Sequence, residues 1–157
     1  MDAATAGVLT TGVLGLAGIV GTFLAPTWSQ RRLEQRRETR ELRTAQRLVA
    51  SDLEVIASSL ESTVRVADVA GLSKNLVLAD LRFDAWTDHR RTLASSLHPD
   101  DWAVVAHAYE ALESTQNGIA GQESDELDTV WLTFVRTDLH SVRRALDTLR
   151  AAKPLPD

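Results

Sequence analysis

The sequence predicts an all-α protein, with a single N-terminal transmembrane helix followed by a cytoplasmic antiparallel four-helix bundle. Three observations lead to this prediction. Residues 3–25 contain no charged side chain, seven arginines lie between Arg31 and Arg47, and the remaining chain carries apolar residues at the helical spacing of three and four. The expected parts are a span over 3–25, a basic juxtamembrane segment over 26–47, a bundle domain over 48–153 and a tail over 154–157.

The uncharged run at the N-terminus is long enough to cross a bilayer. A helix of 23 residues is about 35 Å long, and a hydrocarbon core is about 30 Å thick. A cleaved signal peptide would need basic residues before its apolar run, but only Met1 and Asp2 precede this one. A buried core helix would show a polar face, and none appears at any helical period. These comparisons favour a membrane span over both alternatives.

The arginines set the expected orientation of the span. Basic residues that flank a span are retained on the cytoplasmic side, and here seven arginines follow the span while none precedes it. We therefore expect a single-pass protein of the inner (cell) membrane, with its N-terminus outside and its C-terminal domain in the cytoplasm. Trp28 falls at the level of the lipid headgroups, where an indole ring is well accommodated.

The spacing of the arginines also predicts a surface that binds lipid. In a helix, five of them share one face, and the three glutamates of the segment lie nearly opposite. The expected contacts with anionic headgroups are made by Trp28, Arg32, Arg36, Arg40, Arg43 and Arg47. The alternative is a solvated charged helix with local ion pairs, such as Glu34 with Arg37. The sequence leaves both interpretations open.

Small residues recur along one face of the predicted span. In lipid, such a face lets two helices approach closely, and it is typical of spans that associate. The residues expected to mediate oligomerisation are Gly7, Thr11, Gly15, Gly18 and Thr22. The alternative is that small residues are simply common in membrane spans from an alanine-rich proteome.

The bundle is predicted from four amphipathic segments. An apolar stripe from Leu42 to Ala67 predicts a first helix that ends before Gly71. A second helix is expected from just after Ser73 to Leu97. A third is expected from Pro99 to a stop at Gly118, and a last one is expected after a cap at Ser124. Trp86, Trp102, Trp131 and Phe134 are expected to contribute to the core.

Composition and spacing exclude several classes of function. The chain has no cysteine, so disulfides, thiol catalysis and cysteine zinc sites are excluded. Residues 48–157 carry ten basic and eighteen acidic side chains, and an acidic body argues against nucleic acid as a partner. His107 with Glu110 does not match the ligand order of di-iron bundles, and the row of Asp80, Asp84 and Asp88 is typical of a solvated helix face. We expect no catalytic residue, metal or cofactor.

These observations favour a membrane-anchored interaction or scaffold protein that is not an enzyme. Its expected partners are the lipid bilayer, a second copy of the chain and a protein that the sequence does not identify. The alternative from another class is a membrane-acting, toxin-like effector whose oligomerised spans perturb the bilayer, although the span carries no ionisable residue that would line a pore.

Overall fold

In the computed structural model, the residues that can be described in full are 30, 32–79 and 81–152. Among them, no helix is both long and apolar enough to cross a membrane. The predicted span 3–25, the residues in it that are expected to mediate oligomerisation, and Trp28 lie outside the described residues. The chain divides into two units, Met1–Arg40 and Glu41–Asp157.

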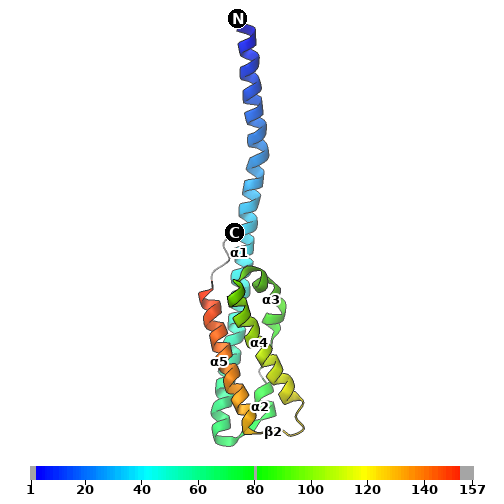
Figure 1. Ribbon diagram of the computed structural model, residues 1–157, viewed down its shortest axis with the longest axis vertical. Coiled ribbons are helices and arrows are strands. Elements are labelled where there is room, and N and C mark those ends of the chain that lie inside the picture. Colours follow the sequence, from blue (N-terminus) through cyan, green and yellow to red (C-terminus); the bar gives the residue numbers. More distant parts are fainter. Residues whose placement is uncertain (1–2, 80, 153–157) are drawn as a thin grey trace. The chain divides into compact units, whose positions relative to one another are not determined.

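The described chain is all-α and forms a helical bundle, with one short pair of strands (Figure 1). Leu72 and Ser73 of β1 pair antiparallel with Leu127 and Glu126 of β2. The elements are α1 (Ala3–Ala70), β1 (Leu72–Ser73), α2 (Lys74–Leu78), α3 (Asp84–Ser96), α4 (Pro99–Ala120), β2 (Glu126–Leu127) and α5 (Thr129–Ala151).

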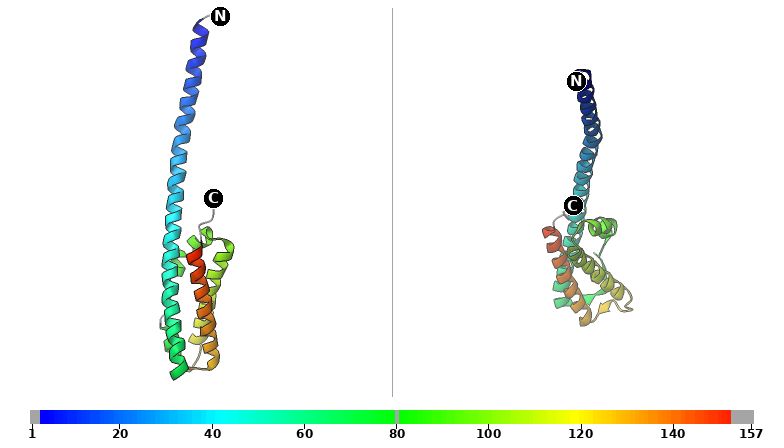
Figure 2. Two further views of the ribbon diagram at one scale, coloured as in Figure 1. Left: turned by 90° about the vertical axis from the view of Figure 1, so that its left-hand side faces the viewer. Right: turned by 45° about the horizontal axis from the view of Figure 1, so that its top comes forward.

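The core of the second unit lies between α4, α5 and the part of α1 from residue 41 onward, which run side by side (Figure 2). The predicted stripe on α1 is confirmed. Its six most buried side chains are at most 2% exposed: Leu42, Ala45, Val49, Leu53, Ile56 and Leu60. Val64 and Ala67 pack against them. Gly71 follows the helix with φ +84°, a conformation that glycine adopts without strain.

The prediction of one helix from Ser73 to Leu97 is wrong, because the segment folds as α2 and α3 with a non-helical stretch between them. Ser73 caps α2 by accepting a hydrogen bond from the Leu76 backbone N–H at 3.3 Å. Leu81, in the connecting stretch, is buried, and its carbonyl oxygen accepts a hydrogen bond from Nε2 of Gln116 on α4. That carbonyl is therefore satisfied by a tertiary contact instead of a helical one.

The ends of the last two helices also differ from the prediction. The glycine at 118 does not stop α4, which continues to Ala120. It instead makes room for Trp131, since a Cβ at this position would lie 2.6 Å from the indole ring. Asp128 caps α5 by accepting a hydrogen bond from the Val130 N–H at 2.6 Å, so the predicted cap at Ser124 is wrong.

The aromatic residues that the structure describes form two groups. Trp86 stacks between Trp102 and Tyr109, with ring centroids at 5.1 and 4.4 Å. Trp86 is buried and Trp102 packs against the core, as predicted. The expectation for Phe134 is wrong: it lies beside Trp131 at the start of α5, with 48% of its surface exposed.

Candidate functional site

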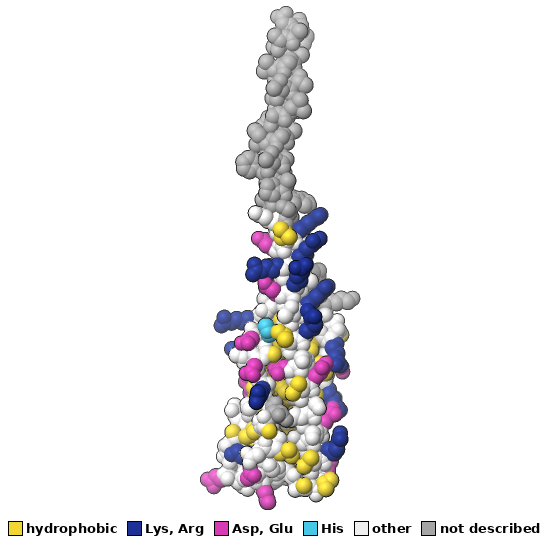
Figure 3. All heavy atoms as spheres, turned by 180° about the vertical axis from the view of Figure 1, so that it is seen from behind, with side chains coloured by type: hydrophobic (Ala, Val, Ile, Leu, Met, Phe, Trp, Pro, Cys, Tyr) yellow, Lys and Arg dark blue, Asp and Glu magenta, His cyan; other side chains and the backbone are white. Residues whose placement is uncertain are grey.

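Exposed arginines characterise the part of α1 that begins at residue 32, where the side chains are described. Figure 3 shows Lys and Arg side chains gathered around this part of the helix. In the first unit, Arg32, Arg36 and Arg40 are all exposed and follow one another at intervals of four residues. This spacing places them on neighbouring turns of the same side of the helix.

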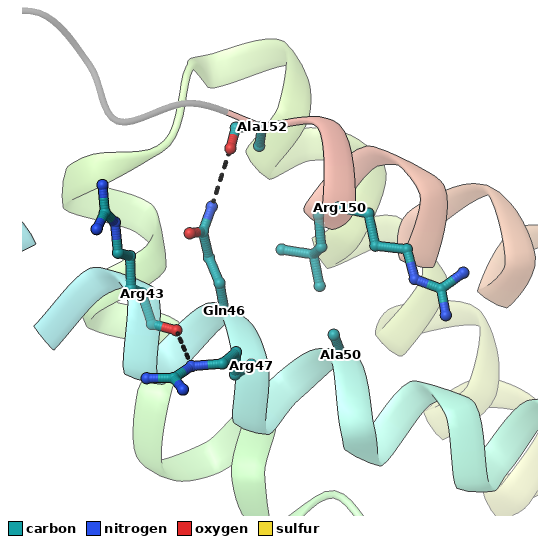
Figure 4. A pocket seen from close by; sticks show the side chains of 7 residues that line it. Arg43, Gln46, Arg47, Ala50, Arg150 and Ala152 are labelled. Carbon is teal, nitrogen blue, oxygen red and sulfur yellow. Dashed lines mark hydrogen bonds between the residues drawn. The ribbon is translucent and has the colours of Figure 1, made fainter. Parts of the chain in front are cut away.

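In the second unit, Arg43 and Arg47 continue as exposed residues and line a groove between α1 and the end of α5 (Figure 4). The groove has a volume of about 490 Å³. Its lining is formed by Arg43, Gln46, Arg47, Ala50, Leu149, Arg150 and Ala152. None of these seven residues is acidic, so the groove favours an anion.

Hydrogen bonds fix the walls of this groove. Gln46 donates from Nε2 to the carbonyl oxygen of Ala152 at 3.4 Å, which satisfies a carbonyl at the end of α5. Arg47 donates from Nε to the carbonyl oxygen of Arg43 at 3.3 Å. The guanidinium groups of Arg43 and Arg47 point away from that of Arg150, which pairs with Glu54 at 2.7 Å. Of the three arginines that line the groove, Arg150 is thus paired with a carboxylate of α1.

Two ionisable groups of the core form a pair between α1 and α4. The Tyr109 hydroxyl donates to Oδ2 of Asp52 at 3.5 Å. Burial, together with the negative charge of Asp52, raises the pKa of Tyr109 well above its usual range. The pKa of Asp52 is also raised, first by burial and further by Asp84, while the hydrogen bond from Tyr109 acts in the opposite direction. The pair links the aromatic stack to α1.

A third ionisable group of the core is Asp138 on α5. Its side chain is 4% exposed, and among the described residues its Oδ2 has no hydrogen-bond partner. Burial raises the pKa of Asp138, and a hydrogen bond with Thr115 of α4 partly offsets that rise. An unpaired carboxylate oxygen in such a place costs free energy when it is charged. Asp138 therefore belongs to the energetics of the bundle.

The remaining polar candidates are exposed on two different helices. His107 and Glu110 are exposed on α4, and Asp84 and Asp88 are exposed on α3, while Asp80 lies outside the described residues. Within 30, 32–79 and 81–152, no group of three or more acidic or histidine side chains could hold a metal ion.

Spacing along α1 alone did not reveal that the end of α5 forms one wall of the arginine groove. Gln46 and Ala152 are 106 residues apart in the sequence. In the sequence, the only indication that the end of α5 could contribute to a basic site was Arg150, a basic residue in the last turn of an amphipathic helix. No protein-family model, curated protein sequence or solved structure matches this chain.

Proposed function

We propose that this protein is a single-pass, membrane-anchored scaffold that holds a helical bundle at the cytoplasmic face of the inner membrane. In this proposal residues 3–25 form the anchor, and the arginines that follow contact anionic headgroups. The bundle then presents its surface to a protein partner, and copies of the chain associate. The observation that carries the proposal is the exposure of five arginines in the part of α1 that directly follows the uncharged run: Arg32, Arg36, Arg40, Arg43 and Arg47.

Physical magnitudes support a role for these arginines in lipid contact. Each basic residue near an anionic surface contributes about 1 kcal/mol, and this contribution weakens as salt screens it. Arg43 and Arg47 line a groove without an acidic lining residue, so a headgroup phosphate there meets no like charge from the lining. Five such contacts would sum to several kcal/mol before the cost of ordering the side chains is subtracted.

The anchoring part of the proposal is tested by topology. A reporter that is active only in the cytoplasm, fused after Asp157 of the full chain, should be active, and the chain should sediment with membranes. The physical reason is that arginines flanking a span are retained inside. A reporter that works only outside the cell, or a chain that stays in the supernatant, would refute the anchor. Loss of membrane potential on production would favour the membrane-acting alternative.

The lipid contact is tested with a matched pair of double variants. The chain has no cysteine, so Leu33→Cys, at a position that is 64% exposed, accepts a single fluorescent label. In bilayers with anionic lipid, a quencher carried by the lipid should reduce the emission, and high salt should restore it. Arg32→Gln with Arg36→Gln should remove most of this quenching. Arg31→Gln with Arg37→Gln, which removes the same charge, should remove less.

Equal loss from the two double variants would mean that total charge matters and the shared face does not. No quenching in the parent chain at low salt would refute the lipid contact altogether.

A further inference from the structure

The helix α1 carries two ridges with the same period, and only one of them is covered. The buried ridge repeats every eleven residues: Leu42, Leu53 and Val64 form one set, and Ala45, Ile56 and Ala67 form another. An uncharged outer ridge has the same period. Because eleven residues are close to three full helical turns, a ridge with this period runs nearly straight along the helix axis. It consists of Thr44, Leu48, Ser51, Val55, Ser59, Ser62, Val66 and Val69.

The outer ridge places large apolar side chains in solvent. Leu48 is 46% exposed, Val55 59%, Val66 41% and Val69 90%. The other positions of the ridge are three serines and one threonine, which are small and uncharged. The ridge covers 26 residues from Thr44 to Val69 and is about 38 Å long. An uncharged strip in which large apolar side chains are this exposed is a candidate interaction surface.

From this ridge, we infer that two copies of the chain associate in parallel through the outer ridges of their α1 helices. A long helix with a matching pattern fits a straight ridge with an eleven-residue period, and α1 of a second copy has this pattern. Large residues of one copy then fit beside the serines of the other. The inference rests on the proposed function in one respect, because anchoring in a single bilayer holds two copies parallel.

The charges beside the ridge favour a parallel pair over an antiparallel one. Asp52 borders the ridge on the side of α4, where it accepts a hydrogen bond from Tyr109. Arg47 borders it on the side of α5, where it lines the groove with Leu149. In a parallel pair related by a twofold axis, the α4-side edge of one ridge meets the α5-side edge of the other. Each Asp52 therefore faces the second copy's Arg47.

An antiparallel pair would bring like edges together. Arg65 lies on the same edge of the helix as Arg47, since the two are 18 residues apart and five helical turns take 18 residues. Arg47 of one copy would then face the second copy's Arg65, and like charges at such an edge oppose association. Charge complementarity therefore selects the parallel arrangement.

The test uses the full chain, which contains no cysteine, oxidised gently in whole cells. Leu48→Cys, Val55→Cys and Val66→Cys should each form a disulfide-linked homodimer, because a parallel pair places identical positions opposite each other. Val130→Cys is the matched control: this valine on α5 is 56% exposed but lies on another helix. It should not cross-link.

A charge on the ridge should break the pair. In the chain that carries Val66→Cys, Val55→Glu should lower the dimer fraction by about tenfold, because two facing carboxylates would be buried. The matched change Val130→Glu should leave it unchanged. The inference is overturned if the ridge cysteines do not cross-link more than the control, or if both glutamate variants have the same effect. It is also overturned if dimers form only when Leu48→Cys chains are mixed with Val66→Cys chains, which indicates an antiparallel pair.

Sedimentation of the same samples separates this inference from the proposed function. Cross-linking in a chain that stays in the supernatant supports the ridge pairing and refutes the anchor. A chain that sediments with membranes but does not cross-link refutes the ridge pairing and leaves the anchor standing.

Discussion

The rim and the centre of the bundle use acidic residues in opposite ways. At the rim between α1 and α5, Asp68, Glu61 and Glu54 pair with Arg136, Arg143 and Arg150. Successive pairs are seven residues apart on both helices, and all six side chains remain partly exposed. In the centre, Asp138 is buried beside Thr115, and its Oδ2 has no partner among the described residues.

The difference shows where a charge is tolerated and what it contributes. The rim pairs stay partly hydrated, so each adds little stability, but together they favour one alignment of α1 with α5. The three pairs run in opposite directions along the two helices, which requires an antiparallel arrangement. Asp138 has lost its hydration, so its protonation state becomes linked to folding. Three substitutions test this comparison, in order of decreasing effect.

The largest effect is expected from the apolar core that surrounds both regions. Leu53 on α1 is fully buried. Leu53→Ala should lower the free energy of unfolding by about 2–5 kcal/mol, because it loses apolar burial and leaves a cavity. This change in free energy is measured by urea unfolding of the full chain in detergent, with circular dichroism as the readout. Leu33→Ala, at an exposed position on the same helix, is the control and should change this free energy by less than about 0.5 kcal/mol. A similar loss in both variants would contradict the buried face assigned to α1.

Asp138→Asn should have an intermediate effect that depends on pH. Burial raises the pKa of Asp138 in the folded chain, so the folded state holds the proton more tightly than the unfolded state. The stability that this group contributes is then complete below the unfolded pKa of 3.8 and is lost as pH rises through the folded value. Asp138→Asn should therefore raise the free energy of unfolding at pH 7, on the order of 1 kcal/mol.

This gain should shrink toward acid pH, where the aspartic acid is neutral as well. Urea titrations at pH 4.5 and pH 7.5 measure the difference, and Asp88→Asn, at an exposed position on α3, serves as the control. A variant that is less stable than the parent chain at pH 7.5 would show that the core requires the carboxylate charge.

The smallest effect is expected at the rim. Arg143→Gln removes the middle pair, with Glu61, and should lower the free energy of unfolding by about 0.2–1 kcal/mol at low salt. Because the pair is partly exposed, the loss should fade in concentrated salt. Arg144→Gln, an exposed neighbour on α5, is the control for charge alone. A loss above about 2 kcal/mol, or one that salt does not reduce, would mean that the rim behaves like a buried site.

Local pattern determined the parts of the fold that depend on near neighbours. The apolar stripe of α1 identified its buried face, because side chains three and four residues apart share one side of a helix. Pro99 with Asp100 and Asp101 correctly marked the start of α4. Local composition also indicated that the arginines between 31 and 47 are exposed, and those that the structure describes are exposed.

Only the tertiary structure decided the features that join distant residues. A glycine at 118 reads as a helix stop, yet it is needed because Trp131 lies against it. At the break between α2 and α3, the carbonyl oxygen of Leu81 accepts a hydrogen bond from Gln116, which is 35 residues further along the chain. The burial of Asp138 and the three rim pairs likewise require α1, α4 and α5 to pack together. Periodicity in a single sequence reports which face of a helix is apolar, but the choice of neighbour for that face is made by packing and charge between segments that fold together.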